Sequence, residues 1–310
     1  MNNRVLPPIG ILCVVSILMS SGPHAQTLPA AWSTGTGGNG TGTVDFEMRT
    51  DGTLIEKGVG SALGLSGTDE GAGTRLLWYP NLSAFRAGTV TGTDWDLSNI
   101  GQYSLSFGLD NLAGNTGSMA FGGNNWSGGQ WSVVLGYYNS AAGDYSIALG
   151  SYSATHWQQG VAIGTICNGT GYQAVAIGVG ASATNNGALA LGYGANSTGG
   201  YSIALNNCTS TGWASLGSGW SNLASADFSV SLNAYTASTS YCETALGKYN
   251  VGGGTSATTW VATDPLLEVG NGTSSSATSD AMVLYKNGNA TFQGVVTVAP
   301  TPDIPMYQGN

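Results

Sequence analysis

The chain has 310 residues, of which 7 are Lys or Arg, 16 are Asp or Glu and 2 are His, and its formal net charge is −9. Charged residues make up 7% of the chain, against roughly 25% in an average soluble protein, so its few cations exclude an electrostatic surface for nucleic acid or an anionic membrane. His24 falls in a predicted signal peptide and leaves His156 alone, which excludes a metal site of several histidines, and nothing indicates a cofactor.

Residues 1–25 have the pattern of a secretory signal peptide. Arg4 supplies a positive charge, residues 9–19 are apolar, and small residues precede a cleavage position after Ala25. That apolar run is shorter than the roughly 20 residues of a membrane-spanning helix, and no later run approaches this length. We therefore expect a secreted, extracellular or outer-surface protein with no integral membrane span; a retained N-terminal anchor is the alternative.

Two segments lie between this signal and the middle of the chain. Residues 26–44 are rich in Gly and Thr, and their composition predicts a flexible linker. Residues 45–102 carry most of the charged side chains. They are predicted to form a small N-terminal module that caps an open sheet edge of the following domain.

A repeat of fourteen residues begins at Tyr103. Each unit contains an apolar-small-apolar triplet followed by Gly or Asn, as in Tyr145-Ser-Ile-Ala-Leu-Gly150. Equal steps over many units are typical of a solenoid, in which terminal repeats are often irregular. The regular units close on Gly108, Gly122, Gly136, Gly150, Gly164, Gly178, Gly192 and Asn206, and the later, irregular units are assigned to Gly217, Asn233 and Gly247.

Each unit predicts one turn of an all-β parallel solenoid. Fourteen residues suffice for two strands of about five residues, and stacked turns lie about 4.8 Å apart. Residues two apart on a strand point the same way, so Ile147 and Leu149 share a face. The resulting bulky stripe needs more cover than one thin chain supplies, which favours self-association. The stripe consists of Phe107, Phe121, Leu135, Leu149, Ile163, Ile177, Leu191 and Leu205.

The units Tyr145-Ser-Ile-Ala-Leu-Gly150 and Ala174-Val-Ala-Ile-Gly178 resemble the head repeats of YadA-like trimeric autotransporter adhesins. The resemblance covers residues 103–247. It implies a left-handed parallel β-roll, a homotrimer whose core contains the bulky stripe, and adhesion to glycans or extracellular-matrix proteins at the cell surface. The membrane barrel and stalk of that family have no counterpart in the sequence, so we expect a released protein or one held non-covalently.

After a Gly/Thr-rich linker at 248–263, residues 264–310 predict a short β module with a tail. Asn287-Gly288 between alternating apolar residues is a hairpin signal. The segment resembles the β-rich stretch that leads into the chaperone domain of phage-fibre-like proteins, although the chaperone itself is not recognisable. An alternative interpretation of the whole chain is therefore a carbohydrate-active β-solenoid or a phage-fibre-like module.

Aromatic residues recur at one position of the repeat, namely Tyr103, Trp131, Tyr145 and Tyr201. Stacked on successive turns, they are candidates for an exposed surface that binds sugar rings or protein partners. The simpler interpretation is that they line the trimer interface.

No catalytic residues are predicted. Asp110 and Asp144 are the only charged residues between Gly101 and Asn206, and they lie roughly 10–12 Å apart along the roll at different positions of the repeat. This arrangement argues against a glycosidase carboxylate pair. Three cysteines follow the signal peptide, so a free thiol, a bond between subunits and simple core packing all stay open. They are Cys167, Cys208 and Cys242.

Overall fold

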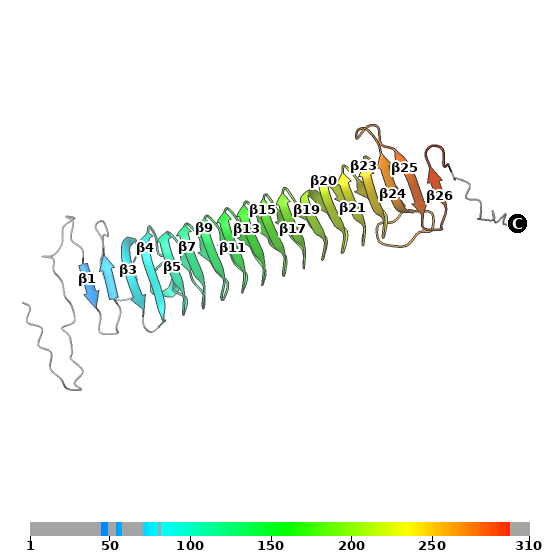
Figure 1. Cartoon of the computed structure of the whole chain (residues 1–310). Helices are drawn as coiled ribbons and strands as arrows, with labels where there is room; N and C mark the ends of the chain where they lie inside the picture. Colours follow the sequence, from blue (N-terminus) through cyan, green and yellow to red (C-terminus); the bar gives the residue numbers. More distant parts are fainter. Residues whose placement is uncertain (1–44, 49–53, 58–70, 80–81, 298–310) are drawn as a thin grey trace, which may run out of the picture.

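The computed structural model describes residues 45–48, 54–57, 71–79 and 82–297. The predicted signal peptide, the predicted linker at 26–44 and the tail beyond residue 297 lie outside these residues. The described part is an all-β solenoid of about 10 turns with repeats of about 14 residues, and its strands follow one another along a single rod (Figure 1). The only helix there is the three-residue η1 (Leu97–Asn99), so no helix of the described chain has the length to cross a membrane.

An antiparallel meander precedes the roll. Its strands are β1 (Asp45–Met48), β2 (Leu54–Lys57), β3 (Gly73–Tyr79) and β4 (Ala84–Val90). β4 pairs in parallel with β5, the first strand of the roll, so the edge of the first turn is covered by backbone hydrogen bonds. A small core supports the junction, and in it the buried Trp95 donates from Nε1 to the carbonyl of Asn111 at 3.0 Å.

Each regular turn of the roll contains one long and one short strand. The long strands are β5 (Leu105–Leu109), β7 (Met119–Gly123), β9 (Val133–Tyr137), β11 (Ile147–Ser151), β13 (Val161–Thr165), β15 (Val175–Val179), β17 (Leu189–Tyr193), β21 (Val230–Ala234) and β23 (Thr244–Lys248). The short strands are β6 (Leu112–Ala113), β8 (Trp126–Ser127), β10 (Ser140–Ala141), β12 (Ala154–Thr155), β14 (Asn168–Gly169), β16 (Ser182–Ala183), β18 (Asn196–Ser197) and β22 (Ala237–Ser238). In β19 (Ile203–Ser210) and β20 (Leu216–Ala224) the two parts are continuous. The regular turns pair in parallel and in register, as the period predicts.

The inside of the roll is filled by small side chains. In the turn of β11 and β12, the buried residues are Ser146, Ala148, Ser153 and Thr155. Side chains alternate in direction along a strand, and Ile147 and Leu149, on either side of the buried Ala148, are only half-buried. The roll is therefore a thin coil filled by small residues, and the bulky residues of each triplet face outward.

The closing glycines form a ladder in which backbone lies directly against backbone. Gly150 has a φ of 116°, and a Cβ atom placed on it would lie 1.9 Å from the carbonyl oxygen of Gly164 in the next turn. Equivalent contacts link Gly108, Gly122, Gly136, Gly164 and Gly178 to the turns that follow them. At these glycines both the backbone angle and the lack of space exclude a side chain.

The assignment of Gly217 as a closing residue is wrong. Gly217 pairs with Ala204, an inward position, and the partner of Asn206 is Gly219, which pairs in turn with Asn233. The turn that contains β19 is one residue shorter than the regular repeat, and the pairing of β19 with β20 shifts register between Asn207 and Thr209. The sequence pattern misleads here because a small inward residue and a closing residue can both be Gly.

The C-terminal end of the roll is closed by three further strands. β24 (Pro265–Asn271) pairs in parallel with β23, whereas β25 (Asp280–Tyr285) and β26 (Ala290–Phe292) continue the sheet in antiparallel fashion. The hairpin predicted at Asn287-Gly288 joins β25 to β26, with Gly288 at a φ of 89°.

Candidate functional site: the outward faces of the roll

Two apolar rows run along the outer side of the long strands, and we call this surface the long-strand face. One row is the bulky stripe predicted from the sequence, in which each member pairs with the next from Phe107 to Leu205. The parallel row consists of Leu105, Met119, Val133, Ile147, Val161, Val175, Leu189 and Ile203.

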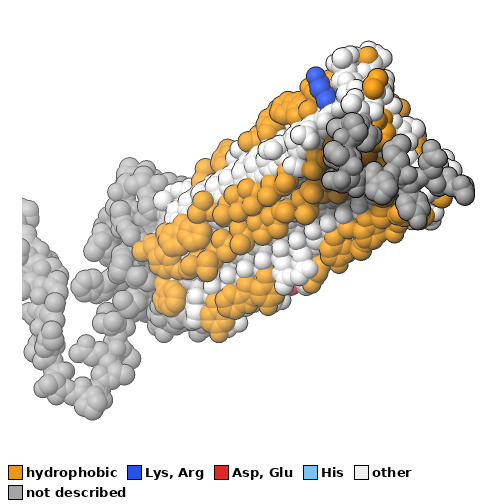
Figure 2. Space-filling model, turned by 45° about the vertical axis from the view of Figure 1, so that its right-hand side comes forward, with side chains coloured by type: hydrophobic (Ala, Val, Ile, Leu, Met, Phe, Trp, Pro, Cys, Tyr) orange, Lys and Arg blue, Asp and Glu red, His pale blue; other side chains and the backbone are white. Residues whose placement is uncertain are grey.

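The long-strand face is uncovered in a single chain. Leu135 is 52% exposed and Ile177 is 37% exposed, and the other members of the bulky stripe are half-buried. At the N-terminal end Phe85, Phe107 and Phe121 form a column with ring centroids 5.4 and 5.2 Å apart. Figure 2 shows hydrophobic side chains in bands that run along the rod. A continuous apolar surface of this kind is typical of an interface.

The outer side of the short strands has a different composition, and we call it the short-strand face. Its outward row consists of Leu112, Trp126, Ser140, Ala154, Asn168, Ser182 and Asn196. Apart from Leu112 and Trp126 near the N-terminal end, these side chains are small or polar. This face is compatible with water and needs no partner to cover it.

The four aromatic residues predicted at one repeat position all lie in a turn and all are exposed. Tyr103, Trp131, Tyr145 and Tyr201 have φ values of 55–58°, in the left-handed region. They do not form one continuous ladder, because Gly or Gln occupies the same position in the intervening turns. The ring of Trp131 lies over Gly117, where a Cβ atom would be 2.3 Å from the indole. Of the four, Tyr201 has an edge-to-face ring contact, with Trp213 at 5.8 Å.

A second aromatic group lies two residues after the closing glycines. Tyr138 and Tyr152 stack with centroids 5.4 Å apart, and Tyr137 meets Tyr138 edge to face at 4.5 Å. Their positions have the same left-handed backbone, with φ values of 53° and 54° at Tyr138 and Tyr152. The fourteen-residue spacing of these two tyrosines is the signal in the sequence that identifies this second column.

The carboxylates of the roll accept hydrogen bonds that stabilise turns. Asp144 accepts a hydrogen bond from the backbone N–H of Gln130 at 2.8 Å, and Asp227 accepts one from Trp213 at 2.7 Å. Asp110 accepts from the N–H and the hydroxyl of Thr91. Within the described residues no group of three or more His, Cys, Asp or Glu side chains is placed to hold a metal ion.

Buried polar side chains stack inside the roll along its axis. The Nδ2 of Asn125 donates to the Oδ1 of Asn111 at 3.0 Å, and Asn139 repeats the contact to Asn125 at 3.2 Å. Two turns further on, Cys167 occupies this column, and its thiol lies 3.1 Å from the carbonyl of Gly178. Cys208 is buried farther along the same column.

The three cysteines are free in the described chain, and Cys242 is half-buried. Cys167 and Cys208 are three turns apart, which corresponds to about 14 Å along the stack. This separation excludes a disulfide between them, because bridged Cα atoms lie within about 7 Å.

Charged groups are buried at both ends of the polar interior. Near the N-terminal end the guanidinium of Arg86 donates to the carbonyls of Phe85, Ser104 and Ala113, and burial lowers its pKa to about 10. Near the C-terminal end Glu243 accepts from the N–H groups of Thr239 and Ser240.

Glu243 has an unusual protonation equilibrium. Burial raises its pKa to about 7, against the opposing effect of its Ser240 and Thr239 hydrogen bonds, and the charge of Glu268 adds to the rise. Burial likewise raises the pKa of Glu268, which accepts from Asn250 and Gly252. Both carboxyl groups are therefore protonated more readily in the folded chain than in water.

The roll is expected to lose stability as the pH rises from about 4.5 to about 7. Folded Glu243 holds its proton up to about pH 7, whereas the unfolded side chain loses it near its ordinary value of 4.5, so the folded state binds more protons in this range. The loss attributable to Glu243 is about 3 kcal/mol. Unfolding temperatures of the wild type and Glu243→Gln, measured from pH 4.5 to 8, test this. The variant should show a flatter dependence; equal slopes contradict the assignment.

Comparison with known proteins agrees with the geometry. A family model described as YadA head domain repeat (2 copies) matches residues 127–153, 170–195 and 183–205. No curated protein matches the chain. The matched residues all lie in the regular part of the roll, where the long strands carry triplets such as Val-Ala-Ile followed by Gly. The matched parts of the roll are therefore similar to YadA head domain repeats, which supports an adhesin-like function.

Proposed function

We propose that the chain acts as a homotrimeric, adhesin-like fibre, secreted or held on the outer cell surface, that binds glycans or extracellular-matrix proteins. The observation that carries the proposal is the long-strand face, whose two apolar rows run along the regular turns without cover from the chain itself. Packing these faces together around a common axis removes them from water. The bulky stripe, Phe107 to Leu205, then forms the trimer core.

The organisation that fits this role has a removable signal at 1–25, a linker at 26–44 and a capping module at 45–102. The roll at 103–247 is the adhesive head, followed by the segment 248–263 and the C-terminal β module. The pairing of β4 with β5 and of β23 with β24 supports capping at both ends, because open sheet edges invite uncontrolled pairing.

Three identical surfaces on one fibre raise the strength of attachment without a strong single site. When one site is bound, the others on the same trimer are held near the target at high effective concentration. The turn aromatics Tyr103, Trp131, Tyr145 and Tyr201 are exposed in a single chain. We propose them either as contacts to such targets or as the margin of the trimer interface.

The first test is the mass in solution of the chain that starts at Gln26, by light scattering after size exclusion. We expect three times the mass of one chain, with and without reductant. Cys167 and Cys208 are buried at inward positions, so neither is available for a bond between subunits. A stable monomer contradicts the proposal, and a trimer that separates in reductant assigns a bond to Cys242.

A further inference from the structure

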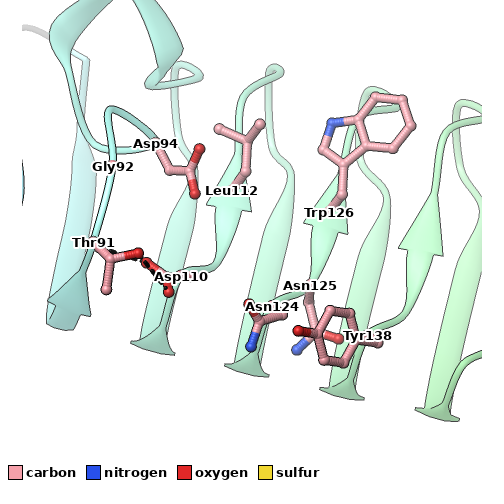
Figure 3. A pocket seen from close by; sticks show the side chains of 9 residues that line it. All are labelled: Thr91, Gly92, Asp94, Asp110, Leu112, Asn124, Asn125, Trp126 and Tyr138. Atoms are coloured by element: carbon pink, nitrogen blue, oxygen red, sulfur yellow. Dashed lines mark hydrogen bonds between the residues drawn. The ribbon is translucent and has the colours of Figure 1, made fainter.

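A groove lies where the N-terminal module meets the first turns of the roll. It has a volume of about 410 Å³, and its lining includes Thr91, Asp94, Asp110, Asn124, Trp126 and Tyr138. Figure 3 shows the two carboxylates at the end nearest the module and the two rings farther along the roll. Neither the family match nor the repeat pattern assigns a role to this groove, since Thr91 and Asp94 lie outside the repeats.

The two aromatic rings of the groove are exposed yet held in place. Trp126 is 47% exposed, and its indole lies over Gly128, where a Cβ atom would be 2.7 Å from the ring. Tyr138 is 48% exposed and is fixed between its contacts to Tyr137 and Tyr152. Rigid, half-open rings give contact area with little loss of conformational entropy, and their polar atoms stay accessible.

The polar side of the groove carries two carboxylates, Asp94 and Asp110, and its lining contains no Lys or Arg. Asp110 is oriented by Thr91, whose N–H donates to Oδ1 at 2.5 Å and whose hydroxyl donates to Oδ2 at 3.0 Å. Each carboxylate oxygen keeps further acceptor capacity, since an ionised carboxylate offers about four lone-pair sites. Partial burial raises the pKa of Asp94, and the charges of Asp110 and Asp96 add to the rise. These groups favour a ligand rich in hydroxyl or amino donors and repel an anion.

The groove is separate from the long-strand face. Leu112 and Trp126 belong to the outward row of the short strands, and Asp110, Asn124 and Tyr138 occupy one turn position on successive turns. Chains that associate through the long-strand face therefore leave this groove open to solvent.

We propose that this groove binds an uncharged or amine-bearing oligosaccharide, with sugar rings against Trp126 and Tyr138 and hydroxyl or amino groups donating to Asp94 and Asp110. The proposal rests on the adhesin-like function and names its ligand class. The carboxylates at one end can accept hydrogen bonds from the hydroxyl or amino groups of a sugar, and the aromatic rings at the other end can pack against its ring face. A Lys-rich peptide also offers donors and can place an ammonium group over either ring, so the test includes such a peptide as the competing ligand.

The test is binding of the chain from Gln26 to immobilised manno-, cello- and chito-oligosaccharides, de-N-acetylated chito-oligosaccharides, sialylated and sulfated glycans, and a Lys-rich peptide. The variants are Trp126→Ala and Asp94→Asn, with Trp157→Ala as the matched control, because Trp157 is 64% exposed and lies outside the groove. Circular dichroism confirms that each variant is folded.

We expect binding to an uncharged or amine-bearing glycan that falls roughly tenfold or more in Trp126→Ala, falls in Asp94→Asn, and is unchanged in Trp157→Ala. The proposal is contradicted by preference for anionic glycans, by binding that Trp126→Ala leaves intact, and by binding of the peptide alone. A trimer that binds no glycan contradicts the glycan site but is consistent with the proposed fibre. A monomer that binds glycan through Trp126 supports the glycan site but contradicts the proposed trimer.

Discussion

Replacing Gly150 by alanine is expected to destabilise the roll by about 4 kcal/mol or more, which is exceptional for the addition of one methyl group. The new Cβ atom would lie 1.9 Å from the carbonyl oxygen of Gly164, so the two turns have to separate. Separation breaks the parallel pairing of β11 with β13 on the long-strand side. The φ of 116° at Gly150 adds strain for any residue with a side chain.

Gly180→Ala is the matched control. Gly180 also has a left-handed backbone, with a φ of 66°, but a Cβ atom added to it would meet no atom within 4 Å. Its position is the one at which Tyr138, Tyr152 and Ile166 carry side chains in other turns. The expected cost is therefore about 1 kcal/mol, from the backbone alone.

Both substitutions are measured by thermal unfolding followed by circular dichroism and by limited proteolysis. Proteolysis is informative because a solenoid is held together by neighbour-to-neighbour contacts and opens locally where a turn is weakened. New cleavage sites near residues 150–164 are expected in Gly150→Ala only. Equal stability of the two variants would contradict the close contact of the closing glycines.

Much of the roll is predictable because each position of the repeat has one physical requirement. The period and the triplet predict parallel turns in register, and the alternation of directions places Ala148 inside with Ile147 and Leu149 outside. The closing Gly or Asn is recognisable in the sequence because it follows the triplet of each regular unit at steps of fourteen residues. The backbone contact to Gly164 is a property of the stack, and it appears only when neighbouring turns are placed together.

The irregular turns and the groove are not predictable in the same way. The repeat pattern assigns Gly217 to the wrong position because the chain loses one residue at the shift between Asn207 and Thr209. The groove combines Asp94, from the segment after β4, with side chains of separate turns. The sequence repeat relates Asp110, Asn124 and Tyr138 to one another, but it carries no information on how the preceding segment packs against them.

Introducing aspartate at Leu135 and Ile177 together is expected to convert the proposed trimer into a folded monomer. Both side chains lie on the long-strand face and are substantially exposed in a single chain, so the substitutions cost the isolated roll little. In a trimer packed through this face, the introduced carboxylates of all three chains lie in an apolar interface, and an unpaired buried charge costs several kcal/mol.

The control introduces aspartate at Ser140 and Ser182, which lie in the same two turns but on the short-strand face. Light scattering after size exclusion gives the mass of both double variants, and circular dichroism checks that the roll is intact. We expect a monomer for the Leu135/Ile177 variant and a trimer for the control. The reverse result places the subunit interface on the short-strand face. The groove at Trp126 would then be buried in that interface, because Trp126 lies in the same outward row as Ser140.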